Sequence, residues 1–170
     1  MKKSTLHPGA YTILICSLLL SGCGIQSIPT ALNEVEAAWS EVLNQYKRRS
    51  DLIPSLVNIV KGSAAHEKET LTAVIEARAQ ATQTQVSVDQ LTPEAMSKFS
   101  QAQSGLSSAL SRLMVVVERY PDLKANQNFR DLQVQLEGTE NRITVARNRY
   151  IQTIKEFNNL VTVRATYFLV

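Results

Sequence analysis

A seven-residue repeat of large apolar side chains constrains the fold of this chain more than any other feature. Phe99, Leu106, Leu113 and Tyr120 follow one another at this interval. A repeat of seven places its members on one face of an α-helix and is typical of helices that pack along a shared seam. We therefore expect a long helix over this stretch, with Leu106 and Leu113 buried.

Two further stretches have the three- and four-residue spacing of amphipathic helices. The first follows Thr30, a suitable N-cap, and its apolar positions are Val35, Ala38, Trp39, Val42 and Tyr46. The other follows residue 126, and its apolar positions are Phe129, Leu132, Leu136, Ile143, Ala146, Tyr150, Ile154, Phe157 and Val161. Short connections between long amphipathic helices make neighbours antiparallel. The sequence thus predicts an all-α fold, an elongated antiparallel bundle of about four long helices.

A proline interrupts the first of these stretches. Pro54 has no backbone N–H, and its ring clashes with the preceding turn of a helix. We expect a kink or break near Pro54, with Asp51 as the cap of the next helical segment. Beyond it, the apolar pattern passes Gly62 and continues to Arg78 as helix.

The seven-residue repeat has clear boundaries. Thr92 offers an N-cap hydroxyl, and Pro93 stands at the first helical position, where proline is favoured. Pro121 and Asp122 end the pattern.

The chain has only six glycines and five prolines in 170 residues, too few for a turn-rich β-sandwich.

The N-terminus has the parts of a secretory signal. Lys2 and Lys3 precede an apolar run of 11 residues at positions 10–20, about half of the roughly 20 that a membrane-spanning helix needs. The sequence Leu-Ser-Gly-Cys at positions 20–23 resembles the bacterial lipobox, whose cysteine receives a diacylglyceryl group. We predict lipidation of Cys23. The alternative is an uncleaved single-pass signal anchor.

If Cys23 is lipidated, we predict three parts of the chain. Residues 1–22 are a lipoprotein signal peptide, residues 23–29 are a tether, and residues 30–170 are a helical domain. Cys16 would leave with the signal peptide, so the mature chain would have no internal disulfide and no cysteine-based zinc site. We expect the main domain outside the cytoplasm, anchored to a membrane of the bacterial cell envelope. Gly24 follows the cysteine where an inner-membrane retention signal would have Asp, which favours the outer membrane if the host is Gram-negative.

Charge and motifs argue against several function classes. Lys and Arg number 18 against 15 Asp and Glu; without Lys2 and Lys3 the balance is 16 against 15, which does not predict nucleic-acid binding. His66 and Glu67 begin a metalloprotease-like motif, but position 70 is Thr and not His. We predict no catalytic residues, no metal site and no cofactor.

The strongest charge cluster is Lys47, Arg48 and Arg49. We interpret it either as a solvated helix end or as a docking site for anionic headgroups or an acidic partner. Trp39 and Tyr46, seven residues apart, fit a core position better than a ligand pocket.

Several segments resemble LemA-family proteins. The most specific are RRSDLIP at positions 48–54 and YPDLKAN at positions 120–126. Further segments are residues 37–42, 60–62, 66–71, 76–78 and 136–141, together with Phe129. The chain departs from the family at Phe157, where Tyr is usual, and in its last residues, 163–170, where the family usually has a Phe-Pro element.

The resemblance implies a membrane-attached, mostly helical bundle with no established enzymatic activity, cofactor or catalytic residues. We therefore expect a membrane-anchored helical scaffold or interaction protein of the bacterial cell envelope without catalytic activity. Its expected partners are the membrane and an unidentified envelope protein, and neither nucleic acid nor a small-molecule substrate. The alternative is a structural spacer that acts through its length, or the uncleaved signal-anchored protein.

Overall fold

Helices make up 90% of the residues that the computed structural model describes, which are residues 27–84, 86–87 and 90–168. No strand occurs among them. The helices are α2 (Ser27–Ser63), α3 (Lys68–Gln83), α4 (Pro93–Val117), α5 (Pro121–Ala125) and α6 (Gln127–Phe168). The predicted all-α bundle is confirmed. The predicted signal peptide and Cys23 lie outside the described residues.

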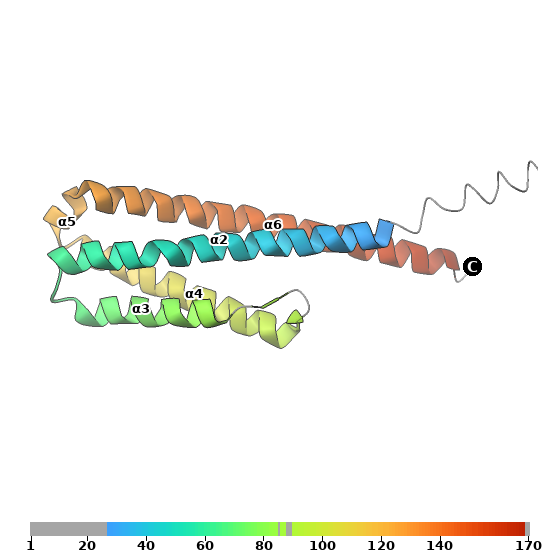
Figure 1. Cartoon of the computed structure of the whole chain (residues 1–170), viewed down its shortest axis with the longest axis horizontal. Helices are drawn as coiled ribbons and strands as arrows, with labels where there is room; N and C mark the ends of the chain where they lie inside the picture. Colours follow the sequence, from blue (N-terminus) through green and yellow to red (C-terminus); the bar gives the residue numbers. More distant parts are fainter. Residues whose placement is uncertain (1–26, 85, 88–89, 169–170) are drawn as a thin grey trace, which may run out of the picture. The chain divides into compact units, whose positions relative to one another are not determined.

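The chain divides into two compact units. One consists of residues 36–152 and contains α3, α4, α5 and the adjoining parts of α2 and α6. In this unit the consecutive long helices run in alternating directions (Figure 1). The described part of the other consists of residues 27–35 and 153–168, the outer ends of α2 and α6. All side-chain interactions discussed below lie in the first unit.

The first helix is longer than predicted at its start and unbroken in its middle. It begins at Ser27, so the last residues of the predicted tether are helical, and it continues through Pro54. Of the kink or break predicted near Pro54, the break, with Asp51 as a new cap, is therefore wrong. A proline at 54 deprives the Ser50 carbonyl of its i+4 donor, and the Arg78 side chain of α3 takes that place, donating from Nε to the Ser50 carbonyl at 2.8 Å.

The break lies later, at residues 64–67, where the sequence predicted continuous helix. Ala64 is buried in the core, and its carbonyl accepts a hydrogen bond from the Glu67 backbone N–H at 3.1 Å. The Glu67 carboxylate also accepts hydrogen bonds from Tyr120 and Arg119, at the far end of α4. The position of the turn at residues 64–67 thus depends on contacts with residues that are distant in sequence.

The start of α4 is as predicted. Thr92 caps it, its Oγ1 accepting a hydrogen bond from the Ala95 backbone N–H at 3.1 Å, and Pro93 is the first helical residue. The helix ends at Val117, and Pro121 does not terminate it but begins the short α5.

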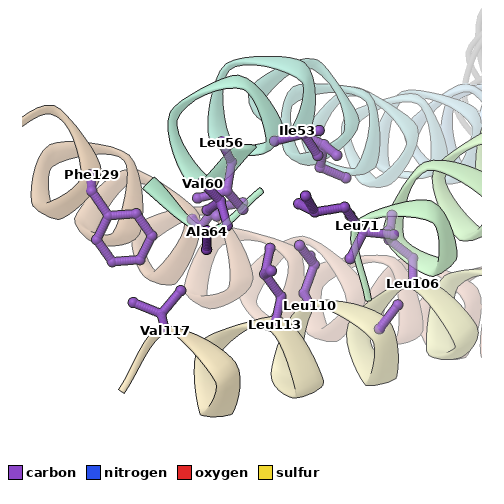
Figure 2. Packing of buried hydrophobic residues seen from close by; sticks show 14 of the residues in the cluster. Ile53, Leu56, Val60, Ala64, Leu71, Leu106, Leu110, Leu113, Val117 and Phe129 are labelled. Atoms are coloured by element: carbon purple, nitrogen blue, oxygen red, sulfur yellow. The ribbon is translucent and has the colours of Figure 1, made fainter. Parts of the chain in front are cut away.

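The seam of α4 forms the centre of the larger core cluster. Leu106 and Leu113 are fully buried, and Leu110 lies beside them, as the seven-residue repeat predicts. Figure 2 shows these side chains facing residues of α2 and α3. The other members of the cluster are Ile53, Leu56, Val57, Val60, Ala64, Leu71, Val74, Ala81, Ala109, Val117, Leu123, Phe129 and Leu136.

A second core cluster is aromatic. Trp39 and Tyr46 both pack against Phe99, with ring centroids 5.5 Å and 5.1 Å away, in edge-on arrangements that aromatic pairs favour. The Trp39 indole Nε1 donates to the Val86 carbonyl at 2.9 Å. Trp39 and Tyr46 are therefore core residues, as the sequence indicated.

Candidate interaction site

A buried arginine connects three helices inside the unit of residues 36–152. Arg49 of α2 is only 1% exposed. Its Nη1 donates to Ser107 Oγ at 2.8 Å and to Glu140 Oε1 at 2.7 Å. Its Nη2 donates to Oε1 and to the backbone carbonyl of Gln103, at 2.6 Å and 3.2 Å. The guanidinium thus links α2 to α4 and α6 through four hydrogen bonds.

The charge of Arg49 is compensated mainly by one carboxylate. Glu140 forms the ion pair, and its side chain is 47% exposed, so this carboxylate stays partly hydrated. The Tyr46 ring adds a cation–π contact, its centroid 5.1 Å from the guanidinium carbon. The buried Arg49 Nε has no hydrogen-bond partner among the described residues.

The three cations predicted as one docking cluster do not share a surface. Lys47 and Arg48 are exposed, but Arg49 is buried, so the docking prediction is wrong for Arg49. Successive residues on an α-helix point about 100° apart. The sequence did indicate that Arg49 is buried. It lies three residues after Tyr46 and four before Ile53, and so continues the buried stripe of α2.

A groove between α4 and α6 begins beside this arginine. It consists of two hollows that share Ser107 and Glu140, and we call it the α4–α6 groove. The first hollow, about 270 Å³, is lined by Ser107, Leu110, Ser111, Met114, Gln133, Leu136, Glu137 and Glu140. The second, about 320 Å³, is lined by Tyr46, Arg49, Ser100, Gln103, Ser104, Ser107, Ser108, Glu140, Ile143, Thr144 and Arg147.

Small side chains of α4 open this groove. The serines at positions 100, 104, 107 and 111 recur at three and four residues, so they line one face of the helix. Their side chains are too short to fill the space toward α6, and a hollow results.

The two halves of the groove differ in charge. Glu137 and Glu140 border the first hollow, which has no cationic side chain in its lining and contains Leu110, Met114 and Leu136. Two arginines, Arg49 and Arg147, line the second hollow. The first half is therefore an apolar trough with a negative edge.

A second polar cluster fixes the end of the bundle at the α2–α3 turn. The Tyr120 hydroxyl donates to Glu67 Oε1 at 2.9 Å, and Arg119 Nη2 donates to the same oxygen at 3.0 Å. The hydrogen bond to the Glu67 carboxylate raises the pKa of Tyr120, because it stabilises the protonated phenol. Burial alone raises the pKa of Tyr150.

The remaining residues singled out from the sequence take up separate positions. His66 is exposed in the α2–α3 turn, not on a helix face. Lys47 borders a smaller hollow of about 180 Å³ between α2, α3 and α4. In residues 27–84, 86–87 and 90–168, no three His, Cys, Asp or Glu side chains are placed to hold a metal ion.

Segments quoted for the family resemblance meet in these clusters. Arg49 and Glu140, from residues 48–54 and 136–141, form the ion pair of the groove. Arg78, from residues 76–78, binds the carbonyl beside Arg49. The comparison of sequences agrees with this resemblance, since a model of the LemA family matches residues 38–168. A search of curated proteins finds no match.

Proposed function

This chain belongs to the LemA family, and on that premise we propose that it is a membrane-anchored helical interaction protein of the bacterial cell envelope, without catalytic activity. Lipidated Cys23 would hold it to the membrane, with the helical domain outside the cytoplasm. None of the described helices has the length and apolarity to cross a membrane. The lipobox-like segment at positions 20–23 is the support for the anchor.

The single observation that supports an interaction role best is the apolar half of the α4–α6 groove. Leu110, Met114 and Leu136 line it, and the carboxylates of Glu137 and Glu140 border it. Apolar lining with charges of one sign favours a segment of complementary pattern. We propose as its occupant a cationic amphipathic segment of another envelope protein, with apolar side chains in the trough and Lys or Arg beside the two carboxylates.

Site-specific photo-crosslinking in cells tests this proposal. A photoreactive residue at Ser111 of the full-length chain lies in the groove, and one at Ile75, which is exposed on α3, serves as the matched control. We expect an adduct with a defined envelope protein from position 111 and none from position 75. Mass spectrometry should place the adduct on a segment with alternating apolar and basic residues.

Charge reversal at the groove edge tests whether the crosslinked segment binds in the groove or merely lies near it. Glu137→Lys should reduce the adduct several-fold, whereas Glu76→Lys on the exposed face of α3 should leave it unchanged. Equal adducts from both positions, an acidic crosslinked segment, or an adduct insensitive to Glu137→Lys would contradict the groove proposal. Absence of any adduct would favour the structural spacer.

A further inference from the structure

The outward face of α6 has a pattern that the α4–α6 groove does not use. Six positions recur at three and four residues and so form one stripe along the helix: Asp131, Val134, Gly138, Arg142, Val145 and Arg149. We call it the outer stripe. All six lie in the unit of residues 36–152. Its two valines are 67% and 68% exposed, on the side of α6 away from buried Ile143 and Ala146.

Gly138, at the centre of the outer stripe, has no packing role within the described chain. A Cβ built at this position would meet no atom within 4 Å. Glycine in a helix interior is less favourable than alanine, because it loses more backbone entropy on folding. A residue without a side chain is useful in such a place where another backbone comes close.

The outer stripe is complementary to itself when two copies run antiparallel. With the two-fold axis midway between Gly138 and Arg142, Asp131 of one copy lies opposite Arg149 of the other, and this pair occurs twice. Val134 then lies beside Val145 of the second copy, and the bare backbone at Gly138 accommodates the stem of its Arg142. A parallel pairing would instead place Arg142 and Arg149 against their own equivalents, which like charges disfavour.

We propose that this chain forms a two-fold symmetric dimer through the outer stripe of α6, with antiparallel helices and two Asp131–Arg149 ion pairs. The contact extends for about 27 Å along one face of α6, from Asp131 to Arg149, at a rise of 1.5 Å per residue. An interface of this size belongs to the small, transient class, so the dimer forms reversibly with concentration. The proposal is independent of the α4–α6 groove and its partner.

Sedimentation of the full-length protein in detergent, over a wide concentration range, tests the dimer. We expect a reversible monomer–dimer equilibrium. Asp131→Arg and Arg149→Asp should each weaken it by about tenfold, because each turns two attractive pairs into repulsive ones. The double variant Asp131→Arg/Arg149→Asp should restore dimerisation, since it recreates both pairs with their signs exchanged.

Two valine variants locate the interface on one helix. Val145→Asp should abolish dimerisation, whereas Val115→Asp should not, because Val115 is equally exposed, at 71%, but lies on α4. Helical circular dichroism confirms that each variant is folded. A protein that stays monomeric throughout, failure of the double variant to restore dimers, or equal loss in both valine variants would overturn the proposal.

Discussion

The Arg49 side chain of α2 donates hydrogen bonds to residues of α4 and α6, which lie far from it in sequence. Its partners Gln103 and Glu140 lie 54 and 91 residues away. A buried guanidinium requires hydrogen-bond acceptors and a counter-charge in place of water. Arg48, its neighbour, projects into solvent and has no such requirement.

These two arginines make a matched pair for mutation. Arg49→Leu should lower the free energy of unfolding by about 2–4 kcal/mol, because buried acceptors on Gln103 and Ser107 lose their donor. Arg48→Leu should change it by less than about 0.5 kcal/mol. Urea-induced unfolding followed by circular dichroism measures both. If Arg49→Leu lowered the free energy of unfolding as little as Arg48→Leu is expected to, the network around Arg49 would contribute no stability.

At the scale of the elements, the position of helix ends depends on contacts between helices. Pro54 leaves α2 unbroken because Arg78 of α3 binds the Ser50 carbonyl. The chain turns instead at residues 64–67, where Glu67 is bound from the end of α4. Each of these contacts joins an element to one that follows it in the chain.

The hydrogen bond between Tyr120 and Glu67 predicts how the end of the bundle at the α2–α3 turn responds to alkali. In the folded protein the pKa of Tyr120 lies above its ordinary value of 10.0. The folded state therefore holds this proton more tightly than the unfolded state does, and the stabilisation is complete below about pH 10 and lost as the pH rises through the folded-state pKa.

We expect Tyr120→Phe to be less stable than wild type near neutral pH, with a difference that shrinks at strongly alkaline pH. Urea unfolding of both proteins at about pH 8 and about pH 11 checks this. A difference that stays constant between the two would show that the phenolic proton is not involved. Tyr150, whose pKa burial raises, remains in both proteins and so cancels from the comparison.

At the scale of the whole molecule, the proposed lipid anchor would determine where the helical domain acts. The lipobox-like segment predicts that Cys23 is acylated after cleavage. Several acyl chains on one cysteine would anchor the protein stably, since each buried CH₂ contributes about 0.8 kcal/mol.

Cys23→Ser should block lipidation and leave an unprocessed precursor of larger mass, which intact-protein mass spectrometry of membrane and soluble fractions detects. The wild-type protein provides the control and should carry acyl chains on an N-terminal cysteine. A wild-type protein that is uncleaved and unacylated would instead establish the signal anchor.

The sequence by itself determined the helical class, the cap at Thr92 and the burial of Leu106 and Leu113. These features depend on residues within one or two turns of each other, because hydrophobic periodicity and capping are local properties. The specific segments RRSDLIP and YPDLKAN also sufficed to indicate the family that the chain belongs to.

Only the tertiary structure decided that α2 passes through Pro54 and that Arg49 points inward while Arg48 does not. Both outcomes depend on partners more than 25 residues away, Arg78 in the first case and Glu140 in the second. A local sequence pattern shows that a group requires a hydrogen-bond partner, but it does not show which residue provides that partner. Packing of the helices supplied the donor for the Ser50 carbonyl and the acceptors for the guanidinium, and it opened the groove where the serines of α4 face α6.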